Sequence, residues 1–418
     1  MTRLNPCELE IDLFCNGIKI HESCNLESDA RLFARTRAGL GSGLELMIPG
    51  DLKDIWMNVP VEEDFVQNTP YFLKKTSTGY IVWDSRENIN YPVMIPPTPD
   101  WYNQKTYRGN PMSMVGVLQG TYLGIYIANS CMFWHPKVAM NCKFCTTGLN
   151  VGVNEIVNKD VEEVVEVCRT AKERSGVTFV HFNSGWQGGK GVEIVAPYIK
   201  AIREKVGLFT GVQLVPEPKE TLWKYDWLID LGANHFSFCY EFHNPQYFRD
   251  LLPGKEKYLS REAFFNAMEY TSRKLGKGKV SGEIIAGVEP LEDTLQAIDY
   301  ITSVGAFPTV CIFRPVIGSD MEHYPTPSFE DMRKVYTHLY HSMRKNGLPM
   351  GIVPNIEVSL VVNPDDTRFL APRTLSWHLY EWKLKIMKLA ARPIISSVLR
   401  PSKAKTDLDS MEQYRPKE

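Results

Sequence analysis

Three cysteines at the spacing C-x10-C-x2-C carry the clearest chemistry in the sequence: Cys131, Cys142 and Cys145. Three thiolates leave one position of a tetrahedral metal site, or one iron of a four-iron cluster, without a protein ligand. A structural zinc site normally has a fourth ligand close by, whereas a catalytic iron–sulfur cluster keeps one iron open for a small molecule. Phe144, between the last two cysteines, adds a flat apolar surface beside that position. The spacing therefore favours an open iron–sulfur cluster, with zinc as the alternative.

A second set of candidate residues lies where expected strands end. These residues are Asn183, Ser184 and Gly185 after residues 177–182, Glu241 in residues 235–242, and Gly287 in residues 280–288. In parallel barrels the functional residues gather at the carboxyl ends of the strands. Glycine at such a place lets the backbone approach a ligand closely. We therefore expect these residues to surround the same opening as the three cysteines.

Glu241 needs a partner if it is buried at the mouth of a pocket, because an unpaired buried carboxylate is costly. The hydroxyl pair of a ribose is one natural partner. A salt bridge with Arg249 or Arg261 is the alternative. Arg314, near the end of the last expected strand, either faces the pocket or forms a structural ion pair.

The elements that position these residues alternate between strands and helices from residue 120 to residue 347. We expect strands at residues 122–128, 177–182, 212–215, 235–242, 280–288 and 308–316. Helical periodicity follows each strand, for example over residues 192–206 and 262–275. The strands are rich in β-branched residues and read as apolar on both faces, as a parallel sheet covered by helices requires. Six such units fall short of eight, so we predict an α/β fold with a partial (β/α)6 TIM-like barrel.

The chain divides into three regions by this pattern. Residues 1–115 are expected to form a small β-rich domain, from the alternation at residues 9–14 and 80–83 and the dense proline and glycine residues. Residues 116–350 form the barrel. Residues 351–418 form a C-terminal helical extension with one amphipathic helix and a loose tail. The apolar stripe of that helix is Leu375, Leu379, Trp382, Ile386 and Leu389, and we expect its solvated side to carry Lys383, Lys385 and Lys388.

Composition limits the partners and the compartment. Because the net charge is −2 and no block of like charge stands out, neither a nucleic acid nor a membrane surface is the expected partner. No run of eighteen or more apolar residues predicts a membrane span, and the N-terminus lacks the features of a signal peptide. Nine cysteines in no regular framework fit the reducing cytoplasm better than secretion. Cys7, Cys15 and Cys24 match no local metal motif, so an auxiliary cluster there is left open.

The cysteine motif resembles that of the radical SAM superfamily, named for S-adenosylmethionine (SAM). Cys142-Lys-Phe-Cys145 matches the superfamily pattern C-x-aromatic-C, whereas the ten residues before Cys142 depart from the usual three. Further phrases are similar to the biotin-synthase-like branch, and most of all to poorly characterised radical SAM proteins of nitrilase gene clusters. These phrases are Phe238-Cys-Tyr-Glu-Phe-His-Asn-Pro245, Pro253-Gly-Lys255, Gly287-Val-Glu-Pro-Leu-Glu-Asp-Thr294 and Phe313-Arg-Pro315. The resemblance covers residues 120 to 325.

The resemblance implies an enzyme that holds a [4Fe–4S] cluster on Cys131, Cys142 and Cys145 and cleaves SAM reductively. The resulting 5′-deoxyadenosyl radical would abstract hydrogen from a small-molecule substrate, with flavodoxin or ferredoxin as the electron donor. The implied SAM contacts are Phe144 at the adenine, Asn183, Ser184 and Gly185 at the amino group, Glu241 at the ribose, Arg261 at the carboxylate, and Gly287 beside the adenine. Two alternatives stay open at this point: a zinc-dependent barrel hydrolase and a non-enzymatic iron–sulfur electron-transfer protein. The substrate, the reaction outcome and the proton-handling residues are not indicated by the sequence.

Overall fold

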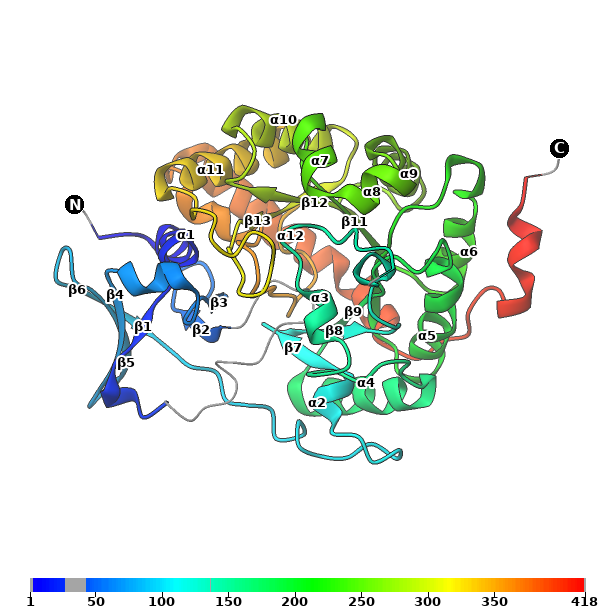
Figure 1. Cartoon of the computed structure of the whole chain (residues 1–418), viewed down its shortest axis with the longest axis horizontal. Coiled ribbons are helices and arrows are strands. Elements are labelled where there is room, and N and C mark those ends of the chain that lie inside the picture. Colours follow the sequence, from blue (N-terminus) through cyan, green and yellow to red (C-terminus); the bar gives the residue numbers. More distant parts are fainter. Residues whose placement is uncertain (1–2, 27–42, 136, 417–418) are drawn as a thin grey trace.

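A seven-stranded sheet curled into a half-barrel is the centre of the computed structural model, which describes residues 3–26, 43–135 and 137–416 (Figure 1). Its order is β13-β12-β11-β10-β9-β8-β7. The strands are β7 (Val117–Gln119), β8 (Tyr122–Tyr126), β9 (Phe179–Asn183), β10 (Phe209–Gln213), β11 (His235–Glu241), β12 (Val280–Ala286) and β13 (Phe307–Ile312). Strands β8 to β13 are parallel, and β7 pairs with β8 in the antiparallel sense. The predicted partial barrel of six parallel strands is confirmed, with one additional edge strand.

Helices cover the outer face of this sheet, as Figure 1 shows. They are α4 (Val161–Ser175), α5 (Gly191–Lys205), α6 (Lys224–Leu231), α9 (Arg261–Leu275), α10 (Leu291–Ser303) and α11 (Phe329–Lys345). The short helices α2 (Met112–Val115), α3 (Thr147–Asn150), α7 (Pro245–Leu251) and α8 (Pro253–Tyr258) lie in the connections between these elements. Helix α4 illustrates their origin: Asp160 caps its first turn, Gly176 ends it in a left-handed conformation, and its apolar stripe is buried. Cys168 lies on that stripe and is a core residue, as the helical spacing indicated.

The inner face of the sheet is more polar than the sequence analysis expected. Along β11 the outward side chains Phe236, Phe238 and Tyr240 are fully buried under helices, while Ser237 and Cys239 point into the half-barrel. Successive side chains of a strand point to opposite faces. The expectation that these strands are apolar on both faces is therefore wrong for the inner face.

The N-terminal region contains two small sheets and one helix. The first sheet has the order β1-β4-β5-β6 and the second pairs β2 with β3. Their strands are β1 (Lys19–Ile20), β2 (Leu44–Ile48), β3 (Ile55–Val59), β4 (Tyr71–Thr76), β5 (Gly79–Asp84) and β6 (Ile89–Val93). The strand expected at residues 80–83 lies in β5, so that prediction is confirmed.

The strand expected at residues 9–14 is wrong, because these residues belong to helix α1 (Pro6–Asn16). Asn5 accepts hydrogen bonds from the first turn and Glu8 bonds back to the Asn5 N–H, which completes a capping box. Both faces of the helix are buried, so the helix needs no polar stripe. Cys7 and Cys15 are eight residues apart on α1, about 12 Å along its axis, which places their sulfurs too far apart to bind one auxiliary cluster.

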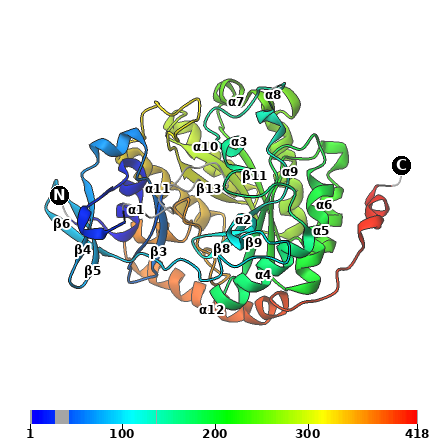
Figure 2. The same ribbon diagram turned by 60° about the horizontal axis from the view of Figure 1, so that its bottom comes forward.

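The C-terminal region begins after α11 and ends in a tail that packs on the barrel. Its main element is the long helix α12 (Leu375–Val398), along the lower edge of Figure 2. The tail was expected to be loose. Instead Trp227 of α6 donates its indole N–H to the Asp407 carbonyl at 3.0 Å, and the Tyr414 hydroxyl donates to Asp230 at 2.8 Å. The domain boundaries at residues 115 and 350 stay predictions.

Candidate functional site

The three cysteines lie in the loop that follows β8, the first parallel strand of the half-barrel. All three are free and partly exposed. The backbone N–H of Trp186 donates to Cys131 Sγ at 3.3 Å, and that of Thr147 donates to Cys145 Sγ at 3.4 Å. Burial raises the pKa of Cys131 and Cys142, and the charge of Cys145 raises both further. The predicted three cysteines are therefore brought together at one end of the half-barrel.

The spacing of the three sulfurs bears on which metal they suit. Among the described residues, the group of three metal-ligating side chains whose ligand atoms all lie within 4.8 Å is Glu357, Asp365 and Asp366, not the cysteines. Thiolates on one zinc ion, at about 2.3 Å from it, would have their sulfurs about 4 Å apart. Each cysteine of a four-iron cluster binds a different iron, so its sulfurs stand farther apart. The three cysteine Sγ atoms are therefore not all within 4.8 Å of one another.

The loop after β9 packs directly against Cys131. Gly185 has a positive φ of 57°, and a Cβ there would lie 2.7 Å from Cys131 Cβ. The Asn183 side chain accepts the Gly185 N–H at 2.9 Å, and the Ser184 carbonyl accepts the Tyr126 hydroxyl at 2.7 Å. Glycine is thus required here for a close approach between the loop and the first cysteine.

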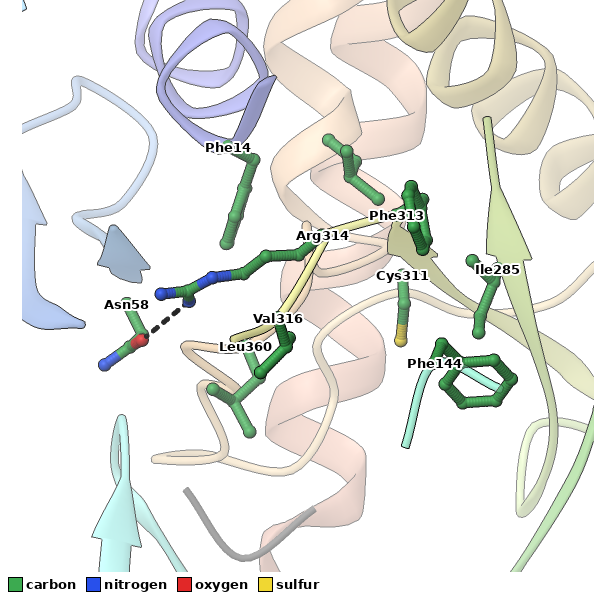
Figure 3. A pocket seen from close by; sticks show the side chains of 10 residues that line it. Phe14, Asn58, Phe144, Ile285, Cys311, Phe313, Arg314, Val316 and Leu360 are labelled. Carbon is green, nitrogen blue, oxygen red and sulfur yellow. Dashed lines mark hydrogen bonds between the residues drawn. The ribbon is translucent and has the colours of Figure 1, made fainter. Parts of the chain in front are cut away.

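Phe144 lines a small cavity at the same end of the half-barrel (Figure 3). The cavity has a volume of about 30 Å³. Ile285 and Cys311 line it from β12 and β13, whereas Phe14 and Asn58 reach it from the N-terminal region. The N-terminal region therefore closes one side of the site.

Arg314, which also lines the cavity, forms a structural ion pair. Its Nε donates to Glu63 Oε1 at 2.5 Å, and one terminal nitrogen donates to Asn58 at 3.4 Å, the dashed line in Figure 3. Both the guanidinium and the Glu63 carboxylate are buried. Of the two roles expected for Arg314, the structure supports the ion pair and also places the residue at the cavity.

Glu241 pairs with Lys255, a residue to which the sequence analysis gave no role. Lys255 Nζ donates to Glu241 Oε1 at 2.9 Å and to the Cys239 carbonyl at 2.6 Å. The salt bridge expected with Arg249 or Arg261 is wrong, because Lys255 reaches back from α8 to the end of β11. Its ammonium also opposes the burial that raises the pKa of Cys142. The cation therefore lies between the carboxylate and the cysteine loop.

Replacing Lys255 by methionine is expected to lower the free energy of unfolding by about 3–5 kcal/mol, because it leaves a buried carboxylate without its partner. Urea unfolding of the two proteins measures the difference. Lys334→Met removes an exposed pair with Asp331 and is expected to cost at most about 1 kcal/mol. Equal effects of the two substitutions would contradict a buried pair at Glu241.

The other two predicted SAM contacts lie against protein groups. Arg261 donates to the His243 carbonyl and lies 5.2 Å from the ring centroid of Phe265. Gly287 has a φ of 94°, and a Cβ there would lie 2.2 Å from Pro327. Glycine is therefore needed at position 287 because of its backbone conformation and the nearby Pro327, without any bound ligand.

Glu289, two residues after Gly287, holds the loop after β11. It accepts the Asn244 N–H at 2.8 Å, and burial raises its pKa to about 7. Since the folded pKa exceeds that of the unfolded chain, the unfolded state loses its proton first as pH rises. Glu289 therefore contributes a loss of stability between about pH 4.5 and pH 7.

Glu289→Gln is expected to remove this loss while keeping an acceptor for Asn244. The difference in unfolding free energy, variant minus wild type, should rise by about 3 kcal/mol between pH 4.5 and pH 7. Urea unfolding at several pH values measures it. If the unfolding free energies of the two proteins change in the same way with pH, Glu289 does not have the raised pKa.

A hydrogen-bonded row of polar side chains crosses the inner face of the sheet and was not predicted from the sequence. Asn183 donates to Gln213 at 2.5 Å, Gln213 donates to Glu283 at 2.6 Å, and the Cys239 thiol donates to Glu283 at 2.8 Å. Burial raises the pKa of Glu283. The signal was available, because polar residues recur at every second position of β11 and β12.

No model of a known protein family matches the sequence. The chain is 24% identical over 254 residues to bacteriochlorophyllide c C-7(1)-hydroxylase of Chlorobaculum limnaeum. The match covers 54% of this chain and 61% of the hydroxylase, so the chain spans about three fifths of that relative.

Two solved structures are similar in outline. Methylornithine synthase (PylB) has a TM-score of 0.39 at 20% identity, and the match covers 70% of this chain and 86% of the synthase. A radical SAM methyltransferase of Sphaerobacter thermophilus has a TM-score of 0.41 at 13% identity, with 70% and 77% covered. Similarities of this size indicate neither a reaction nor a substrate.

No helix in the described ranges has both the length and the apolar character that a membrane crossing requires.

Proposed function

We propose that the chain is a radical SAM enzyme with a [4Fe–4S] cluster on Cys131, Cys142 and Cys145. The observation that carries the proposal is the gathering of these three thiols at the mouth of the half-barrel, with Gly185 packed on the first of them. When bound, the cluster and SAM would supply a 5′-deoxyadenosyl radical that abstracts hydrogen from the substrate. The fourth position that three cysteine ligands leave open favours this function over a zinc-dependent hydrolase, which usually draws on histidine or carboxylate ligands.

The chain's own residues would hold and shield this chemistry. The N–H groups of Trp186 and Thr147 stabilise negative charge on two of the sulfurs. Phe144 offers a flat surface to the adenine at the cavity, and we assign Glu241 to the ribose and the loop at Asn183 and Ser184 to the amino group. We assign Arg261 to the carboxylate of SAM. To bind it, the Arg261 guanidinium would have to give up its hydrogen bond to the His243 carbonyl.

The substrate is proposed to be a small molecule bound inside the half-barrel. Gln213 and Glu283 present hydrogen-bonding groups there. The hydroxylase relative acts, by its name, on a bacteriochlorophyllide, which is one small-molecule class to test as a substrate. A cytoplasmic location and a flavodoxin or ferredoxin as the electron donor complete the proposal.

Anaerobic reconstitution with iron and sulfide tests the function. The expected result is a brown protein that forms 5′-deoxyadenosine from SAM after reduction with dithionite. A colourless protein that retains one zinc ion would support the hydrolase instead. A cluster whose electron paramagnetic resonance spectrum does not change with SAM would support an electron-transfer protein.

A further inference from the structure

The apolar stripe of α12 faces away from the protein. Its members are between 44% and 77% exposed: Leu375, Leu379, Trp382, Ile386 and Leu389, followed by Ile394. The opposite side of the same helix is the buried one, with Trp377, Leu384 and Ile395 in the interior. Lys383 and Lys385 are exposed, as expected, and Lys388 is half-buried. The expectation that the apolar stripe packs inward is wrong. About 20 Å of helix surface therefore presents large apolar side chains.

The charged residues of α12 that border this stripe are positive. Lys383 lies along one side of it, and Lys385 and Arg392 lie along the other. The acidic residue of α12 is Glu381, which is turned inward and bound to Arg368 at 2.7 Å. An apolar stripe with cations on both sides is the pattern of a helix that lies in the surface of an anionic bilayer.

A groove beside the stripe adds another cation. It has a volume of about 300 Å³ and is lined by Leu379 and Lys383 of α12 and by Arg344 at the end of α11. The Arg344 guanidinium lies 4.7 Å from the ring centroid of Tyr380, which holds it at the edge of the stripe. Arg344 and Lys383 are thus placed where phosphate groups would meet the helix.

A second copy of the chain fits this surface less well. The apolar residues from 375 to 389 alternate at spacings of four and three, which would permit a coiled coil. The positions that flank such a seam are then His378, Lys383, Lys385 and Arg392. These would oppose like charges across a pair of identical helices, which disfavours pairing.

We propose that α12 docks this enzyme on the surface of an anionic membrane. The stripe enters the interface, with Trp382 at its centre, and the flanking cations contact lipid phosphates. This proposal is independent of the reaction at the cysteine site, and the docking needs no membrane-spanning segment.

Cosedimentation of the full chain with lipid vesicles tests the docking. The chain should bind vesicles of equimolar phosphatidylcholine and phosphatidylglycerol at least about tenfold more tightly than vesicles of phosphatidylcholine alone. The double variant Leu379→Ser, Trp382→Ser and the double variant Lys383→Glu, Lys385→Glu should each weaken binding at least about tenfold. All four side chains lie on the surface of α12, so circular dichroism should show unchanged folding.

The double variant Lys190→Glu, Lys219→Glu is the charge-matched control, because both lysines are exposed and lie outside α12. Its affinity for vesicles should stay within about twofold of the wild type. Binding that all three double variants retain would overturn the proposal. Failure of the wild-type chain to bind either kind of vesicle would also overturn it. A dimer in solution that the stripe variant dissociates, without vesicle binding by the wild type, would assign the stripe to a second copy instead.

Discussion

Alanine in place of Cys145 is expected to abolish the iron–sulfur absorbance of the reconstituted protein and to lower 5′-deoxyadenosine formation by more than about a hundredfold. Loss of a partner that only supports a metal ligand already costs about 10–100-fold, and Cys145 is proposed as a ligand itself. Iron analysis and the visible spectrum measure binding, and product formation measures the reaction.

Cys168→Ala provides the matched control. Cys168 is fully buried in α4 and packs in the core, so its replacement should cost stability but leave the iron content unchanged. A Cys145→Ala protein that keeps four irons and full activity would show that the loop at residues 131–145 is not the cluster site.

Gly185→Ala is expected to lower cluster binding and activity by at least about tenfold. The new Cβ would have to lie 2.7 Å from Cys131 Cβ and 2.8 Å from the Tyr126 hydroxyl, so the loop or Cys131 must move. Displacing a ligand from a geometry that must hold to within about 0.5 Å impairs the site. Iron content after reconstitution measures the effect.

Gly189→Ala separates this contact from backbone strain. Gly189 lies in the same loop with a positive φ of 78°, but nothing lies within 4 Å of the Cβ that alanine would add. Both substitutions carry a strain of about 1–2 kcal/mol, whereas Gly185→Ala alone meets Cys131. If both variants lose the cluster equally, the strain of the loop and not the contact is responsible.

The parallel strands were predictable from sequence because each is a short apolar run between turn residues. The three cysteines were predictable because their chemistry depends on local spacing. The prediction of a strand at residues 9–14 was wrong because apolar and polar residues can also alternate in a helix that is buried on both sides. The capping box formed by Asn5 and Glu8 was the local signal that favoured the helix.

Partners distant in the chain were harder to predict. Glu241 had several cations within reach, and only the fold shows that Lys255 on α8 is the one beside it. In α12 the periodicity defined an apolar face but not its direction, since either side of a helix can pack on the protein. Trp377 and Leu384 supply the buried contacts that decide this orientation.

The position of the N-terminal region has a consequence for protein engineering. Phe14 and Asn58 close the cavity beside Phe144, and Glu63 neutralises Arg314. In a barrel without residues 1–115, the Arg314 guanidinium would lose its partner Glu63. The cavity would also be open to water and dioxygen. Chimaeras with related enzymes should therefore exchange the N-terminal region and the barrel together, so that the ion pair and the closed side of the cavity are kept.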